Sequence, residues 1–146
     1  MIFIKLNYKT FKGMDSPEFS AASEVRKIVF IDEQEFSYDL DDTDKTAFHV
    51  LICDDDKPIA AGRFFFDENN QPHIGRVAVL KEYRRSGVGR YLMEILEKTA
   101  SEQGADYVTL GAQMRAAEFY SRVGYVPYGE PYFEEYCEHI NMKKSL

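Results

Sequence analysis

The residues with the clearest chemical potential are the glycines and arginines of the run Arg84-Arg85-Ser86-Gly87-Val88-Gly89-Arg90. The run stands between the strand-like segment Val77-Ala78-Val79 and apolar residues that recur at helical spacing. The first amides of a helix lack partners within it, and the helix dipole adds partial positive charge there. Glycine lets an anion approach the backbone closely. Together with the three arginines, the pattern predicts a diphosphate-binding turn.

Other phosphate-binding motifs do not fit this run. A Walker A loop would need a closing Gly-Lys-Ser or Gly-Lys-Thr, which is missing. A dinucleotide fingerprint would need a third glycine at position 92, which is occupied by Leu92. The run alone leaves two interpretations open, an anion site and an ordinary tight turn into a packed helix.

Three helices are expected to surround this turn. The first begins at Asp15-Ser16-Pro17-Glu18, where a capping side chain precedes proline, and continues through Ala22, Val25, Ile28 and Val29. The second runs from about Gly87 to Gln103, with one apolar stripe and Gly104 at its end. The third covers Gln113–Val123 and ends at Gly124.

Seven segments have the pattern of strands, and polar turns between the early ones predict an antiparallel meander. They are Met1–Asn7, Ala47–Cys53, Pro58–Phe66, His73–Leu80, Tyr107–Gly111, Tyr125–Tyr128 and His139–Lys143. Strands followed by helix, strand, helix and strand predict an α/β (α+β) fold with helices on the faces of a mixed sheet. No repeat or linker divides the chain, so we expect a single domain over residues 1–146.

Charge and composition limit the partners. The chain has 146 residues and a net charge of −7, which disfavours nonspecific binding to nucleic acid or anionic lipid. We find neither the pattern of a signal peptide nor an apolar run long enough to cross a membrane. Two cysteines without CxxC spacing are typical of reduced thiols, and we therefore expect a cytoplasmic protein.

Two motifs in register resemble the GNAT superfamily of acyl-CoA-dependent N-acyltransferases. Arg84-Arg85-Ser86-Gly87-Val88-Gly89 is similar to the family's Arg/Gln-x-x-Gly-x-Gly/Ala signature, and Val77-Ala78-Val79 to the strand before it. Ala116–Tyr125 is similar to the second motif, A-x-x-F-Y-x-x-x-G-F/Y. The order and distance of the two motifs are those of the family.

The rest of the chain resembles a narrower group of small bacterial members, the ElaA-like or YjcF-like proteins. The resemblance is carried by Val25–Gln34, the acidic loop after it, His49 and the closing segment Glu138–Met142. The family resemblance implies a twisted, mostly antiparallel sheet of six to seven strands with about four helices. It also implies a sheet that splits between Val79 and the strand Tyr107–Gly111.

By this resemblance the ligand is acetyl-CoA, bound in the split. The backbone of Val77 to Val79 would hold the pantetheine arm, and the turn from Arg85 to Arg90 the pyrophosphate. Gln113 stands where many relatives have a cofactor-binding Asn. The implied cofactor site is Val77, Ala78, Val79, Arg84, Arg85, Ser86, Gly87, Val88, Gly89, Arg90, Gln113 and Tyr120.

The resemblance implies transfer of the acetyl group directly to a primary amine. Tyr120 matches the residue that protonates the departing thiolate in many relatives; the alternative is a core tyrosine. Glu33, after the first helix, is the candidate base. Glu35, His49, His139 and an ordered chain of waters are its rivals.

The acidic segment Asp39–Asp44 lacks the glycine and the closing glutamate of an EF-hand, so we expect a solvated loop and no metal site. As a solvated loop it could favour a cationic acceptor. The acceptor could be a small amine, polyamine, amino sugar, antibiotic or protein lysine, and the protein could form a homodimer. The alternative function is a module that binds acyl-CoA without turnover, as a sensor or partner subunit.

Overall fold

The computed structural model describes residues 4–146, and its seven strands form one sheet in the order β1-β2-β3-β4-β5-β7-β6. The first four strands are an antiparallel meander, and only the pair β4–β5 is parallel. The strands are β1 (Leu6–Lys12), β2 (Phe48–Asp54), β3 (Lys57–Phe66), β4 (Pro72–Val79), β5 (Tyr107–Gln113), β6 (Val126–Glu134) and β7 (Cys137–Ser145). The predicted mixed, mostly antiparallel sheet is confirmed.

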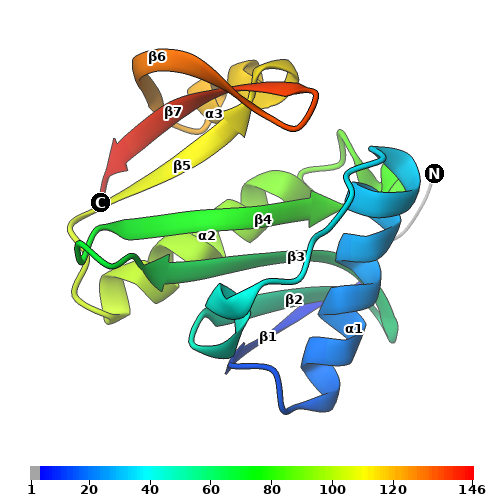
Figure 1. The fold of residues 1–146 in the computed structure, drawn as a ribbon. Helices are drawn as coiled ribbons and strands as arrows, with labels where there is room; N and C mark the ends of the chain where they lie inside the picture. The colour runs from blue at the N-terminus through cyan, green and yellow to red at the C-terminus, as the bar shows by residue number, and fades with distance from the viewer. Residues whose placement is uncertain (1–3) are drawn as a thin grey trace.

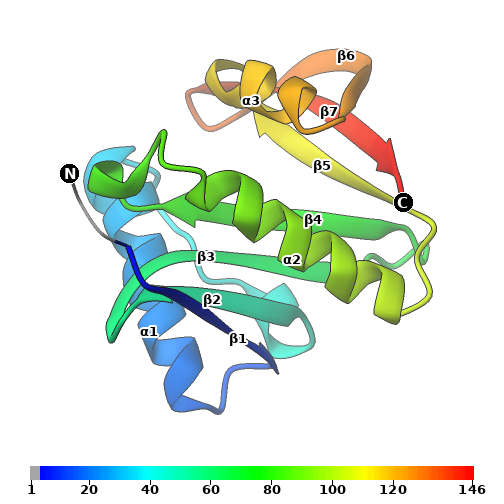
Figure 2. The same ribbon diagram turned by 180° about the vertical axis from the view of Figure 1, so that it is seen from behind.

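Helices cover both faces of the sheet (Figures 1 and 2). Helix α1 (Pro17–Arg26) lies on one face, and α2 (Val88–Glu102) and α3 (Ala117–Arg122) lie on the other. Between residues 4 and 146 the structure has these three α-helices, where about four were expected. Short 3-10 segments add single turns at Asp42–Lys45, Lys81–Tyr83 and Met114–Ala116.

Local chemistry explains where α1 begins and how it continues. Ser16 is the N-cap and its Oγ accepts a hydrogen bond from the Phe19 amide at 3.3 Å, with a proline in the first turn, as predicted. Beyond Arg26 the chain continues as a π-helix, η1 (Lys27–Glu33). Such wide turns are rare and often occur at functional sites. The predicted stripe therefore changes register, and Ile28 is exposed.

The first strand was predicted in the wrong place. Of the predicted segment Met1–Asn7, residues 1–3 lie outside the described residues, and Ile4 and Lys5 are not in a strand. Strand β1 instead begins at Leu6 and pairs with β2 up to Lys12. The sequence signal is weak because β1 is an edge strand with mostly exposed side chains. No helix of the described chain is long and apolar enough to cross a membrane.

The parallel strands β4 and β5 separate along their length. They share one paired position, His73 with Thr109, near their beginnings, and Figure 1 shows them diverging toward their carboxyl ends. Strand β4 also carries a bulge between the paired positions Arg63–Gly75 and Ala61–Ala78, where two β4 residues, Arg76 and Val77, oppose the single β3 residue Gly62. Arg76, in the bulge, has a left-handed φ of 49°. The predicted split of the sheet is present.

Candidate active site

The turn before α2 presents a row of free backbone amides. Tyr91 is the first residue of the helix with a backbone hydrogen bond, from its amide to the Gly87 carbonyl at 3.0 Å. Among residues 4–146, no acceptor faces the amides from Arg85 to Arg90. Arg85 and Gly87 have left-handed φ angles of 62° and 88°, an alternation that turns successive amides toward one side. The predicted turn therefore has the geometry of an anion site.

The Arg84 side chain forms contacts within the protein that the sequence did not predict. Its guanidinium makes a two-pronged ion pair with Glu33, at 2.6 and 2.7 Å, and its Nε donates to the Val79 carbonyl at 3.0 Å. The Arg84 side chain is therefore held in place by Glu33 and Val79, and its contact with the diphosphate stays a prediction. Arg84 ties the end of β4 to the segment after α1, while Arg85 and Arg90 stay exposed.

The ion pair with Arg84 also affects whether Glu33 can act as a base. The hydrogen bonds and charge of Arg84 lower the pKa of the Glu33 carboxyl, against a smaller opposing effect of burial. A carboxylate that is held by arginine takes up a proton less readily. Glu33 also does not line the cavity described next. The geometry thus argues for another proton acceptor.

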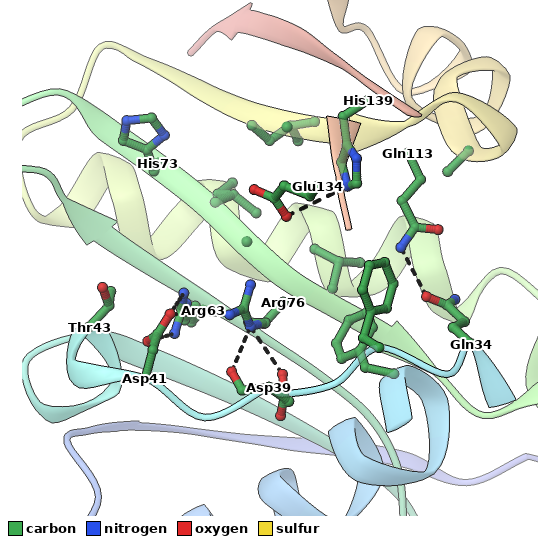
Figure 3. Close-up of a pocket in the computed structure, with 18 of the residues that line it drawn as sticks. Gln34, Asp39, Asp41, Thr43, Arg63, His73, Arg76, Gln113, Glu134 and His139 are labelled. Atoms are coloured by element: carbon green, nitrogen blue, oxygen red, sulfur yellow. Dashed lines mark hydrogen bonds and ion pairs between the residues drawn. The ribbon is translucent and has the colours of Figure 1, made fainter. Parts of the chain in front are cut away.

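A cavity of about 600 Å³ lies beside the split between β4 and β5. Its walls come from Gly75–Val77 on β4, from Leu110, Gly111 and Gln113 on β5, and from the segments around η1, the acidic loop and the β6–β7 turn. Figure 3 shows polar side chains from these elements directed into one space. The cavity thus brings β4 together with residues far away in the sequence.

Tyr120 lies at the inner wall of this cavity. Its ring packs edge-on against Phe119 and Tyr125, at centroid distances of 5.1 and 5.8 Å. Burial raises the pKa of the phenol, so the hydroxyl stays protonated at neutral pH. Within the described chain that hydroxyl has no hydrogen-bond partner. An unpaired phenol at a cavity wall can donate a hydrogen bond into the cavity, and its raised pKa makes it a weaker acid than an exposed tyrosine.

Gln113 spans the split. Its Nε2 donates to Gln34 Oε1 at 2.9 Å (Figure 3), and its Oε1 accepts from Arg115 Nε at 2.7 Å. Both ends of the amide are thus used by the protein itself. One N–H of Nε2 and one lone pair of Oε1 are left for a further contact.

The rival bases occupy different places. His49 is in the core, bonded at 3.1 Å to the Asp44 carbonyl, and burial lowers the pKa of its ring. Glu35 is exposed at a left-handed position, and neither residue lines the cavity. His139 does line it, and Figure 3 shows its ring pointing into the space next to Glu134.

The acidic segment is not a solvated loop, and that prediction is wrong. Asp39 and Asp44 are buried, and three arginines from distant elements bind them and Asp41. The ion pairs are Arg26 with Asp39 and Asp44, Arg63 with Asp41 and Asp44, and Arg76 with Asp39 and Asp41. Three carboxylates and three guanidinium groups balance, which removes the basis for a cationic acceptor bound by this loop.

Asp44 should make folding stability depend on pH. Burial alone would raise the pKa of this carboxyl, but hydrogen bonds and charge from Arg26 and Arg63 outweigh it and lower the pKa to about 2. The unfolded value is 3.8, so the stabilisation is complete above that pH and is lost as pH falls toward 2. We expect a loss of roughly 2 kcal/mol from this group.

Urea unfolding of Asp44→Asn and wild type at pH 6, 4 and 3 measures the first part of that loss, about 1 kcal/mol by pH 3. Asp44→Asn should lack this part of the acid destabilisation, whereas Asp42→Asn should behave as wild type because the Asp42 side chain is 96% exposed. An equal acid-induced loss in Asp44→Asn and wild type would contradict the assignment.

Comparison with known proteins agrees with this geometry. The sequence pattern of the acetyltransferase (GNAT) domain matches residues 17–146. The chain belongs to the GNAT acetyltransferase family. The uncharacterized N-acetyltransferase YjcF of Bacillus subtilis is 34% identical over 124 residues, which cover 83% of this chain and 88% of that protein.

Two crystal structures support the same assignment. ElaA of Escherichia coli superposes with a TM-score of 0.86 at 30% identity, covering 97% of this chain and 100% of that one. An acyl-CoA N-acyltransferase from Pseudomonas aeruginosa gives a TM-score of 0.86 at 29% identity, with the same coverage. The resemblance to the GNAT superfamily and its ElaA-like and YjcF-like members is confirmed, and with it an acyltransferase family.

Several residues of the cavity escaped the sequence analysis, among them Gln34, Arg63, Arg76, Tyr132 and Glu134. One signal existed: Arg63 interrupts the otherwise apolar strand Pro58–Phe66. A buried arginine needs carboxylate partners, and the segment Asp39–Asp44 supplies them, although Asp54–Asp56 is nearer in the sequence. Throughout residues 4–146, no group of three or more His, Cys, Asp or Glu side chains is placed to hold a metal ion.

Proposed function

We propose that this member of the GNAT family transfers the acetyl group of acetyl-CoA directly to a primary amine. The observation that carries the proposal is the common cavity of Val77 and Tyr120 at the mouth of the split. Val77 belongs to the strand assigned to the pantetheine arm, and Tyr120 is the assigned acid. Their shared cavity leaves room for an acceptor beside the thioester.

Different residues of the site would bind the pyrophosphate, align the pantetheine arm and donate a proton. The free amides from Arg85 to Arg90 would bind the pyrophosphate, aided by the exposed side chains of Arg85 and Arg90. The backbone of Val77 to Val79 would align the pantetheine arm in the split. Tyr120 would donate its proton to the sulfur as the carbon–sulfur bond breaks, which lowers the barrier for a poor leaving group.

A thiol-release assay with acetyl-CoA and a panel of primary amines tests the function. The panel should contain 2-phenylethylamine, spermidine, lysine and glucosamine, and mass spectrometry should identify the acetylated product. We expect thiol release that depends on the amine and matches product formation. Binding of acetyl-CoA without acetylation of any amine would support the alternative, a non-catalytic acyl-CoA-binding module.

Replacing Gly87 with valine should weaken acetyl-CoA binding. Nothing lies within 4 Å of an added Cβ, so the effect comes from the φ of 88°, which a β-branched residue resists. Strain of about 1–3 kcal/mol converts to a 5- to 150-fold rise in Kd, which isothermal titration calorimetry can measure.

Gly104→Val is the matched control. Gly104 has a φ of 92° and equally open surroundings, but it follows the other end of α2. It should lose similar stability while the folded protein keeps its affinity for acetyl-CoA. Equal Kd values for Gly87→Val and wild type would show that the turn is not the binding site.

A further inference from the structure

His139 is a buried side chain with one ring nitrogen fixed and the other free. It lies on β7, is 5% exposed, and stacks on Tyr132 at a centroid distance of 5.5 Å. Its Nδ1 lies 2.9 Å from the Cys137 carbonyl, which can only accept a hydrogen bond. Nδ1 therefore carries a proton, and in the neutral ring Nε2 has a free lone pair.

The free nitrogen faces the cavity beside a carboxylate. Glu134 Oε2 lies 4.0 Å from His139 Nε2, beyond hydrogen-bond distance, and no closer partner of Nε2 exists among residues 4–146 (Figure 3). The Glu134 side chain is 60% exposed and has no other ion pair in the described chain. Both groups line the cavity and offer acceptors there to a cation that can donate hydrogen bonds.

On the described walls of the cavity, His139 and Glu134 are the only neighbouring base and carboxylate that are not bound to other protein groups. Asp39 and Asp41 are held by arginines, and the Glu135 carboxylate accepts from the Ser37 amide at 3.0 Å. Glu33, as shown above, pairs with Arg84 outside the cavity. The titratable groups in contact with His139 are Tyr132, Glu134 and Cys137. The other titratable and charged residues of the cavity wall are Tyr38, Asp39, Asp41, Arg63, His73, Arg76, Tyr120 and Glu135.

We infer that His139 accepts the proton of the acceptor's ammonium group, and that Glu134 draws this ammonium to it. The inference rests on the proposed amine acetylation and adds to it the proton acceptor and the charge of the bound acceptor. The free Nε2 lone pair can accept a proton, whereas the Glu33 carboxylate is already paired with Arg84.

The step balances in protons and electrons. His139 Nε2 takes one proton from the ammonium, and the electron pair stays on the amine nitrogen. The nitrogen lone pair forms the carbon–nitrogen bond. The carbon–sulfur bond breaks at the same time, and its electron pair stays on sulfur. Tyr120 gives sulfur a proton and regains the one that nitrogen loses on becoming an amide. His139 then releases its proton to solvent.

The variant His139→Asn separates a chemical role from a structural one. The asparagine amide can keep the hydrogen bond to the Cys137 carbonyl, but it has no group in the place of a basic Nε2. At pH 7 we expect kcat/KM for the fastest amine of the panel to fall about 100-fold. The Kd of acetyl-CoA should stay within twofold of wild type.

The pH profile distinguishes the two roles. Without a proton acceptor, the variant can react only with amine molecules that are already neutral in solution. Its kcat/KM should therefore rise tenfold per pH unit up to the amine's own pKa and approach wild type there. Glu138→Gln, an exposed neighbour on β7 outside the cavity, should keep the wild-type profile.

A pH-independent loss in His139→Asn, or an unchanged kcat/KM, would overturn the role of His139 while the proposed acetylation stands. If the wild-type protein binds acetyl-CoA but acetylates none of the amines, both the proposed acetylation and the role of His139 are contradicted. Rescue of the variant at high pH supports the inference.

Discussion

Replacing Tyr120 with phenylalanine is expected to lower kcat at least about 100-fold, because general acid catalysis contributes on the order of 10²–10⁴ in rate. The phenol is buried, protonated and unpaired, so its loss removes the proton donor and leaves the ring packing unchanged. The Kd of acetyl-CoA should stay near the wild-type value. Single-turnover kinetics with saturating acetyl-CoA measures the chemical step directly.

Tyr125→Phe is the control for this change. Its hydroxyl donates to Glu97 at 2.8 Å, away from the cavity, so its removal should cost about 1 kcal/mol of stability and leave kcat unchanged. Tyr120→Phe with wild-type kcat would remove the acid role and return Tyr120 to a core tyrosine.

Replacing Arg26 with methionine is expected to lower the free energy of unfolding by about 3 kcal/mol or more. Arg26 is 1% exposed and bonds both Asp39 and Asp44, so its loss leaves buried carboxylates short of partners. In a chain of this length the melting temperature should fall by roughly 10 °C. Urea and thermal unfolding measure the effect.

Arg122→Met is the matched control, since the Arg122–Glu118 pair is on the surface with both side chains mostly exposed. Such pairs contribute about 0–1 kcal/mol, and this change should leave the melting temperature almost unaltered. A loss in Arg26→Met no larger than in Arg122→Met would mean that the buried network does not stabilise the fold.

The buried network also shapes one wall of the cavity. Arg63 and Arg76 come from β3 and β4, and they bind the segment that carries Asp39 and Asp41 across the sheet. The segment becomes a wall of the cavity because arginine binds it there. A sequence of alternating aspartates carries no sign of those partners, since ion pairs join residues far apart in the chain.

The sequence by itself determined the elements whose signals are local. A glycine-rich turn before an apolar helical stripe, a capped first helix and alternating strands depend on neighbouring residues, and these were predicted with small boundary errors. The order of the two motifs at Arg84–Gly89 and Ala116–Tyr125 was enough to identify the family. Edge strand β1 was misplaced because few of its side chains are buried.

Only the tertiary structure decided which groups are free to react. Glu33 and Arg84 neutralise each other across 51 positions of sequence, and three aspartates are committed to three arginines. The free nitrogen of His139 depends on one carbonyl that fixes the other nitrogen. Residue type sets what a side chain can do, but proton affinity depends on neighbours in space, and those are brought together only by folding.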